Sequence, residues 1–426
     1  MKEKETPMGL FSCLFLITYK KIAWLLNVVP HKVGLKIKEG DRLVIRCPIE
    51  ARDFAIVSTK KAYELGASEV VVDYRDQEIS RLKYENESLE ILTDVPKHKV
   101  DKENYYMEKK AKYLSVTGSD PDAFKGVDSE KLFKANLATS KALKDFSAKM
   151  MANYVSWIVV GASIPSWATK VFPDLSEDEA VRKLWYEIFS SVRLFEDDPE
   201  KALEDHVNNL NRYSKFLNEN KFEKLHYKSE KGTDLEVCLP KGYIFAGAGD
   251  VNSDGEEFIA NMPSEEVFSA PRLDGVNGKV YSTMPLNYNG NLIEDFYLVF
   301  KDGEVVDYDA KSGKEYLKNI IETDEGSKRL GEVALVSHNT PISMRKVLFY
   351  NTLYDENASC HFALGKSYPS CIEDGEKLTI EELKERGMND SLTHVDFMVG
   401  DASTEIIGIK ENGEEVQIFK DGNFVI

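Results

Sequence analysis

Cysteine is scarce in this chain of 426 residues, and its spacing follows no known motif. The five cysteines are widely scattered and include no CxxC pair. They are Cys13, Cys47, Cys238, Cys360 and Cys371. An odd, scattered set argues against a disulfide framework and against a cysteine-ligated zinc site. We therefore expect reduced thiols and a cytoplasmic protein.

Positive charge is also in deficit. Acidic residues outnumber lysine and arginine by 73 to 55, which gives a net charge of -18 at pH 7. A surface of this sign repels the phosphates of nucleic acids and of anionic lipids. We expect no nucleic-acid partner and no membrane partner.

Long apolar runs are missing as well. A membrane-spanning helix needs roughly 20 apolar residues, and the stretch that most resembles a secretory signal covers only residues 9–17. Tyr19, Lys20 and Lys21 follow it, where small residues would precede a cleavage site. We therefore interpret residues 1–29 as an irregular or helical leader.

Several common motifs are absent from the sequence. It contains no GxGxxG after its first strand and no GxxxxGK[ST], so a nucleotide would lack its usual glycine-rich phosphate cradle. It contains no HExxH, which excludes the zinc proteases that carry two histidines one turn apart on a helix. Any metal site must use ligands from separate segments.

The first half of the chain alternates between strand and helix patterns. Residues 43–45 and 70–72 have the pattern of short buried strands, and residues 54–67 between them space their apolar side chains as a helix. A long helical segment over 131–153 and a strand at 157–160 follow. We predict an N-terminal α/β domain over residues 30–225, with a largely parallel sheet.

One further helix in this domain has a clear start signal. Ser176 and Glu179 stand three residues apart after Pro173, the spacing of a capping box. The apolar residues that follow form a single stripe. We predict a helix that begins after Ser176.

Past residue 226 the sequence is rich in hairpin signals. Asp302-Gly303 separates strand-like residues 296–300 from 305–306, and Asn412-Gly413 and Asp421-Gly422 repeat the signal. These dipeptides tolerate the positive φ angles of a type I′ turn. We predict a C-terminal α+β domain over residues 226–426, rich in antiparallel strands, with helices at 313–322 and 380–387.

His394 and Asp396 form the clearest candidate site. In a strand over residues 392–399 they share one face, and the apolar residues between and after them share the other. Burying an imidazole beside a carboxylate is costly unless something such as a metal binds both. The alternative is an ordinary strand with one solvated face.

Glu332 is a second candidate because it interrupts the apolar run at 330–336. A carboxylate in a buried strand needs a cation beside it or a raised pKa. A salt bridge to Lys328, Arg329 or another basic residue is the alternative.

Two other segments hold candidates with plainer alternatives. His361 lies among small residues that we interpret as a helix ending at Gly365, where a hydrogen-bonded core histidine is also common. Glu265 and Glu266 precede an apolar pair, which also fits a loop-to-strand entry with one exposed carboxylate. With the candidates above, Glu266 and His361 complete a set of three carboxylates and two imidazoles. Divalent cations favour such a set, which suggests a dinuclear site.

Six stretches carry a resemblance to a known family. They are WATKVFPD (167–174), NMPSEEVFSAP (261–271), LIEDF (292–296), ETDEGSKRLGEVALV (322–336), FYNTLYDENASCHFALG (349–365) and HVDFM (394–398). From about residue 40 onward the chain resembles the leucyl-type metallo-aminopeptidases, which include aminopeptidase T, aminopeptidase S and PepS. The first 30 residues match that pattern poorly.

The resemblance implies a function and a ligand set. It implies release of N-terminal amino acids from peptides with a free N-terminus, two divalent metal ions (zinc, cobalt or magnesium) and a homodimer. The implied ligands are Glu266, Glu332, His361, His394 and Asp396. It also implies that Tyr368 lies close to the metals.

We add three hypotheses about roles. Glu332 bridges the two ions, with Glu266 and His361 on one side and His394 and Asp396 on the other. By analogy with other dinuclear aminopeptidases, Glu265 is the general base, and its alternative is a solvent-facing glutamate. Tyr368 donates a hydrogen bond to the developing oxyanion.

Two other functional classes use the same ligands. One is a dinuclear amidohydrolase or phosphoesterase, and the other is a catalytically silent metal-binding protein. Assays of peptide and phosphate-ester substrates separate these classes.

Overall fold

The computed structural model describes residues 34–247, 249–288 and 291–426. The leader expected at residues 1–29 lies outside these ranges. Contacts divide the chain into two compact units. Unit 1 comprises Met1–Glu204 and Asp250–Met262, and unit 2 comprises Asp205–Gly249 and Pro263–Ile426. Relative to the boundary expected at residue 225, this division assigns 205–225 to unit 2 and 250–262 to unit 1.

Unit 1 contains a five-stranded parallel sheet in the order β2-β1-β3-β4-β9. The strands are β1 (Arg42–Pro48), β2 (Glu69–Arg75), β3 (Lys112–Thr117), β4 (Trp157–Gly161) and β9 (Asn261–Met262). Helix α2 (Arg52–Glu64) joins β1 to β2, which confirms the predicted β-α-β unit. The short strand β9 arrives from much later in the chain to extend the sheet at β4.

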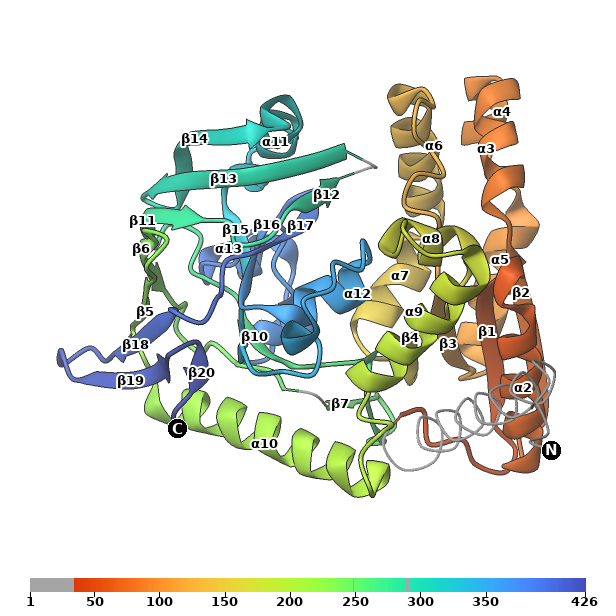
Figure 1. Cartoon of the computed structure of the whole chain (residues 1–426), viewed down its shortest axis with the longest axis horizontal. Coiled ribbons are helices and arrows are strands. Elements are labelled where there is room, and N and C mark those ends of the chain that lie inside the picture. The colour runs from red at the N-terminus through yellow and green to blue at the C-terminus, as the bar shows by residue number, and fades with distance from the viewer. Residues whose placement is uncertain (1–33, 248, 289–290) are drawn as a thin grey trace, which may run out of the picture. The chain divides into compact units, whose positions relative to one another are not determined.

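The remaining helices of unit 1 follow the sheet strands (Figure 1). They are α3 (Gln77–Asn86), α4 (Leu89–Thr93), α5 (Lys97–Glu108), α6 (Ser129–Ala142), α7 (Lys144–Met151), α8 (Pro165–Val171) and α9 (Glu177–Ser191). The capping box of Ser176 and Glu179 begins α9, as predicted. The helical segment predicted over 131–153 is instead two helices, because the backbone leaves helical geometry at Leu143 (φ -100, ψ 18). Helix α10 (Pro199–Asn220) contains the boundary between the units.

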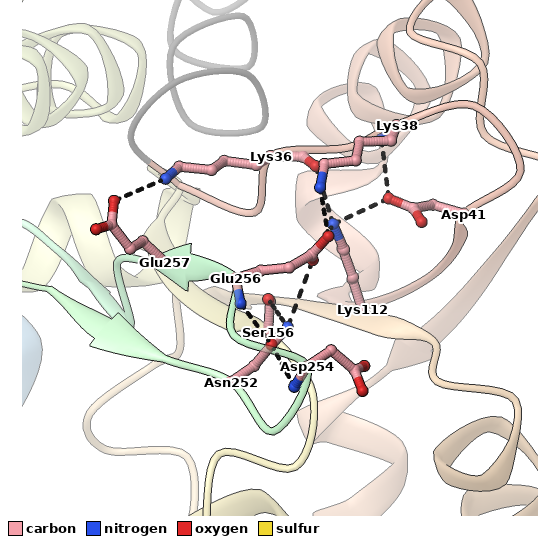
Figure 2. A network of polar contacts seen from close by, with 9 residues as sticks. All are labelled: Lys36, Lys38, Asp41, Lys112, Ser156, Asn252, Asp254, Glu256 and Glu257. Atoms are coloured by element: carbon pink, nitrogen blue, oxygen red, sulfur yellow. Dashed lines mark hydrogen bonds and ion pairs between the residues drawn. The ribbon is translucent and has the colours of Figure 1, made fainter.

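A network of charged side chains fixes the hairpin of β7 (Asp250–Val251) and β8 (Glu257–Phe258) to unit 1 (Figure 2). At its centre is Lys112, whose side chain is 5% exposed. Its ammonium group lies 2.9 Å from Asp41 Oδ2 and 3.2 Å from Glu256 Oε2, and it donates to the carbonyl oxygen of Lys36 at 2.9 Å. Lys38 also pairs with Glu256. The acidic hairpin is therefore neutralised by lysines from early in the chain.

Unit 2 contains a nine-stranded sheet whose main path is β12-β13-β11-β6-β5-β18-β19-β20, with β14 paired to β13. The strands are β5 (Lys224–Lys228), β6 (Asp234–Cys238), β11 (Val276–Tyr281), β12 (Leu286–Tyr288), β13 (Asn291–Lys301), β14 (Glu304–Ser312), β18 (Glu405–Ile409), β19 (Glu415–Lys420) and β20 (Asn423–Phe424). Their pairings are antiparallel. The long hairpin of β13 and β14 is plain in Figure 1.

The predicted helices of unit 2 are present, and two of its three predicted turns have positive φ angles at both residues, whereas at Asn412-Gly413 only Gly413 does (φ 82°). Asp302 and Gly303 have φ angles of 50° and 82° between β13 and β14, and Asp421 and Gly422 have 49° and 72° between β19 and β20. The predicted helices are α11 (Lys314–Ile321) and α13 (Ile380–Glu385). The structure confirms the predicted fold class, a parallel α/β part followed by a part rich in antiparallel strands. None of the helices in the described ranges has the length and hydropathy needed to cross a bilayer.

A second, four-stranded sheet of unit 2 carries the candidate site. Its order is β10-β15-β16-β17, and every neighbouring pair is antiparallel. The strands are β10 (Glu266–Ser269), β15 (Leu330–Val336), β16 (His361–Gly365) and β17 (His394–Met398). One face of this sheet shares a single hydrophobic core with the nine-stranded sheet; Val267, Val333, Leu335, Phe362, Leu364 and Phe397 belong to it. Because that face is committed to the core, the other face is left for polar side chains.

Candidate metal centre

The polar face of the four-stranded sheet brings together all five predicted ligands. The register pairs Ala334 with His361 between β15 and β16, and it pairs Ala363 with both Glu332 and Asp396. These residues therefore share one face, because side chains directly opposite each other in a ladder point to the same side. His394 is two residues from Asp396 on β17, and Glu266 occupies the same face of β10. The face expected for His394 and Asp396 is confirmed.

The helix predicted around His361 is wrong. A short helix α12 (Thr352–Asp355) and a 3-10 turn (Glu356–Ala358) end before it, and His361–Gly365 is the strand β16. This strand pairs on both edges and all five of its residues are buried. Ladder hydrogen bonds on two sides and full burial outweigh the local preference of small residues for a helix.

One ligand group consists of Glu266, Glu332 and His361. Nε2 of His361 lies 3.1 Å from Glu266 Oε2 and 3.4 Å from Glu332 Oε1. Nδ1 of the same ring lies 3.0 Å from the carbonyl oxygen of Ser359, to which it donates. In the neutral ring this leaves Nε2 with a lone pair directed at the two carboxylates.

The second ligand group consists of Glu332, His394 and Asp396. Nδ1 of His394 donates to the carbonyl oxygen of Lys366 at 2.7 Å. Its Nε2 lies 3.3 Å from Glu332 Oε2 and 3.3 Å from Asp396 Oδ1. Within each group, one ligand atom per residue lies within 4.8 Å of the others. Glu332 belongs to both groups and offers a different oxygen to each histidine.

The donor sets of both groups fit divalent cations. Each neutral imidazole presents a lone pair to carboxylate oxygens, which are acceptors too, so a positive charge is needed between them. Oε2 of Glu266 is buried and, among the described residues, has no hydrogen-bond donor when Nε2 of His361 carries a lone pair. The salt bridges considered for Glu332 are not formed, because Arg329 pairs with Glu304 and Lys328 with Glu325.

The pKa shifts at the site also indicate that it requires positive charge. Burial opposes ionisation of Glu332, but its contacts with His361 and His394 outweigh that effect and lower its pKa to about 2. Burial also disfavours charge on His394, yet Asp396 and Glu332 raise its pKa to about 11. The pKa of His361 is raised well above its ordinary value by Glu266 and Glu332, against the effect of burial. Without a metal, protons on the two imidazoles supply the missing charge.

Glu265 and Tyr368 lie in different surroundings. Glu265 is 3% exposed, so the solvent-facing alternative is wrong. Its Oε2 lies 3.5 Å from His206 Nε2, and its N–H donates to Asn357 Oδ1 at 2.6 Å. The ring of Tyr368 lies 4.9 Å from that of His394, and burial together with the charges of nearby carboxylates raises its pKa. Tyr368 therefore adjoins the ligand groups, whereas neither group includes Glu265.

Glu356 is a further acidic residue at the site that the sequence analysis did not single out. It lies in the turn before β16, and its pKa is raised well above the ordinary value by burial and then by the charges of Glu266 and Asp396. Glu356 stands five residues before His361. Because a helix was predicted around His361, the turn that precedes the strand and holds Glu356 was not predicted.

Comparisons with known proteins identify the family of the chain. Residues 16–424 match the family described as thermophilic metalloprotease (M29). Aminopeptidase AmpS of Bacillus subtilis (strain 168) is 45% identical over 393 residues, which cover 92% of this chain and 96% of that protein. Aminopeptidase T of Thermus aquaticus is 37% identical over 403 residues, covering 93% and 96%. The solved structure of wild-type AmpT from Thermus thermophilus superposes with a TM-score of 0.89 at 36% identity, covering 96% of this chain and 100% of that one.

The fold, the ligand groups and these relatives define a metal-dependent hydrolase of the aminopeptidase class. The chain belongs to the thermophilic metalloprotease (M29) family. The predicted family, the predicted enzyme class and the need for divalent metal are thereby confirmed.

Proposed function

We propose that the five ligands hold two divalent metal ions, and that the protein uses them to release N-terminal residues from peptides with a free N-terminus. The observation that carries this proposal is the pair of ligand groups that share Glu332. A carboxylate that offers one oxygen to each group is suited to bridge two ions. Glu266 and His361 then complete one site, and His394 and Asp396 complete the other.

The ions supply Lewis-acid polarisation of the scissile carbonyl and activation of the attacking water when they are bound. The protein's own groups prepare the site. The carbonyl oxygens of Ser359 and Lys366 fix which nitrogen of each imidazole carries hydrogen, so Nε2 remains a ligand atom. In this proposal the hydroxyl of Tyr368 donates a hydrogen bond to the oxyanion. A set of carboxylates and imidazoles accepts zinc, cobalt or magnesium.

Two glutamates are candidates for the proton-accepting base. Glu265 is the residue expected from the sequence, and Glu356 is added because its pKa responds to the charges of Glu266 and Asp396. Glu265→Gln and Glu356→Gln variants should keep their metal, whereas the variant of the true base should lose at least about a hundredfold in kcat. A glutamate whose replacement leaves kcat unchanged has no part in the proton transfer.

The assembly and location of the protein are also inferred. We infer a homodimer from the family resemblance, and sedimentation of the purified protein tests it. We infer a cytoplasmic location because, in the described part of the chain, Cys47, Cys238 and Cys360 form no disulfide, which suits a reducing compartment. Fractionation of cells that express the full chain tests that location.

The deciding experiment combines metal analysis with substrate assays. Protein reconstituted with zinc, cobalt or magnesium is tested on leucyl anilide and on a phosphate ester, and a His394→Ala variant is tested in parallel. Cleavage of the anilide that disappears with the variant's bound metal supports the proposal. Cleavage of the phosphate ester alone favours a phosphoesterase, and metal binding without turnover favours a catalytically silent protein.

A further inference from the structure

An aromatic side chain accompanies the ligands on the polar face of the four-stranded sheet. Phe268 lies two residues after Glu266 on β10, so both side chains point to the same face. The register pairs Phe268 with Ala334, and Ala334 with His361 on the next strand. Phe268 therefore lies in the same row of side chains as a metal ligand.

The backbone of Phe268 is paired on both sides, and its ring packs against a buried cluster. Its N–H donates to the carbonyl oxygen of Ala246 at 3.1 Å, and the N–H of Ala246 donates back at 2.9 Å, while β15 pairs along its other edge. Its ring packs on a cluster of four buried residues and remains partly exposed. The cluster consists of Ala270, Cys371, Ile372 and Met388. A side chain that is already ordered loses little conformational entropy when it contacts a substrate.

Tyr368 extends this apolar surface from β10 to the second ligand group. Its ring centroid lies 6.1 Å from that of Phe268, edge to face, and 4.9 Å from that of His394. Neither Phe268 nor Tyr368, nor any of the four residues of the buried cluster, is an acid or a base that is charged at neutral pH. An aromatic, uncharged surface therefore adjoins a strongly acidic centre.

We infer that Phe268 and Tyr368 receive the side chain of the substrate's first residue, and that Phe268 sets a preference for bulky apolar residues over alanine. The inference rests on the proposed function. The proposed cleavage follows the substrate's first residue, so the carbon that bears its free amine lies next to the ligands, and the first side chain branches from that carbon. That side chain must therefore contact a surface next to the ligands. A leucine side chain buries more apolar area there than alanine does, and a charged one would be dehydrated without a partner.

The Phe268→Ala variant tests this assignment. For leucyl anilide, kcat/KM should fall roughly 10- to 100-fold, because several contacts with the first side chain are lost. For alanyl anilide the change should be less than about threefold, since alanine does not reach far enough to lose them. Phe268→Leu should restore most of the preference for leucine. Bound metal, measured by elemental analysis, should match that of the unmodified protein.

Val267→Ala is the matched control. Val267 is the neighbouring residue on β10, points to the opposite face and is buried in the shared core. Its replacement should lower stability and change both substrates by the same factor. The ratio of the two substrates therefore separates a specificity role from general damage to the strand.

One outcome would overturn the assignment, and another concerns the proposed function. If Phe268→Ala keeps its bound metal and leaves the ratio of kcat/KM for the two substrates unchanged, Phe268 has no role in specificity. If the unmodified, metal-loaded protein cleaves neither anilide, the proposed function fails. In that case the calorimetric affinities for L-leucine and L-alanine decide the role of Phe268. A leucine preference that Phe268→Ala abolishes supports the surface, and a preference that it leaves unchanged overturns it.

Discussion

Both units of the molecule gather acidic side chains, but they neutralise them with different partners. In unit 1, Asp41 and Glu256 meet the ammonium groups of Lys38 and Lys112. In unit 2, the described partners of Glu332 are the imidazoles of His361 and His394. The partners are therefore ammonium groups in unit 1 and imidazoles in unit 2.

The kind of cationic partner separates a charge network that is complete by itself from a site that can bind a ligand. A lysine ammonium is a cation that stays in place at neutral pH, so the carboxylates around Lys112 are permanently satisfied. A histidine whose Nδ1 is bound to a carbonyl offers Nε2 to either a proton or a metal. The cluster in unit 2 can therefore exchange its positive charge.

The largest expected effect comes from the carboxylate shared by both ligand groups. Glu332→Gln keeps the shape of the side chain but removes its charge from both groups. Bound metal should fall by at least about half, and kcat/KM by at least about a thousandfold, the rate equivalent of about 4 kcal/mol of lost stabilisation. Elemental analysis and anilide kinetics measure the two effects.

Glu325→Gln is the control for that variant, because Glu325 pairs with Lys328 and its side chain is 86% exposed. It should retain metal and turnover. Normal metal content in Glu332→Gln would show that the carboxylate is not a ligand and would break the contrast between the units.

The second prediction concerns the closed network of unit 1. Lys112→Met removes a nearly buried ammonium and leaves Asp41 and Glu256 without its charge. Removing one partner from such a network should lower the free energy of unfolding by about 2–4 kcal/mol, measured in urea. The side chain of Lys38 is 61% exposed, so Lys38→Met should lower the free energy of unfolding by less than about 1 kcal/mol. Equal stabilities for the two variants would contradict a central role for Lys112.

The third prediction concerns the protons that the imidazoles of unit 2 release when metal binds. The pKa of His394 is raised to about 11 and that of His361 well above its ordinary value, so both rings are protonated at pH 7 without metal. Metal needs their neutral forms, so binding should release about two protons, and affinity should rise as pH rises. Calorimetry of the metal-free protein in buffers of different ionisation enthalpy measures this release. Metal binding without proton release at pH 7 would mean that the rings are already neutral.

Sequence patterns sufficed where a signal is local. The alternation in β17 places His394 and Asp396 on one face, and the apolar run around Glu332 predicts its buried strand. Asp302 and Gly303 marked the hairpin of β13 and β14 because their backbone preference suits a tight turn. In each of these cases the period or the dihedral preference lies within a few residues.

Other features could not be obtained in this way because they depend on contacts between distant segments. The strand at His361 forms because β15 and β17 are available on both of its edges. Residues 250–262 belong to unit 1 because Glu256 pairs with Lys112 and β9 pairs with β4. Glu356 and Phe268 became visible only after these pairings placed them beside the ligands.

The sequence by itself determined the family, the class of chemistry and the identities of five residues able to hold metal, because residue type and local period are written along the chain. Only the tertiary structure decided that these residues form two groups around Glu332, and that an aromatic surface adjoins them. The reason is physical. Strand register sets which side chains stand opposite each other, and register is fixed by packing between segments that lie far apart in the sequence.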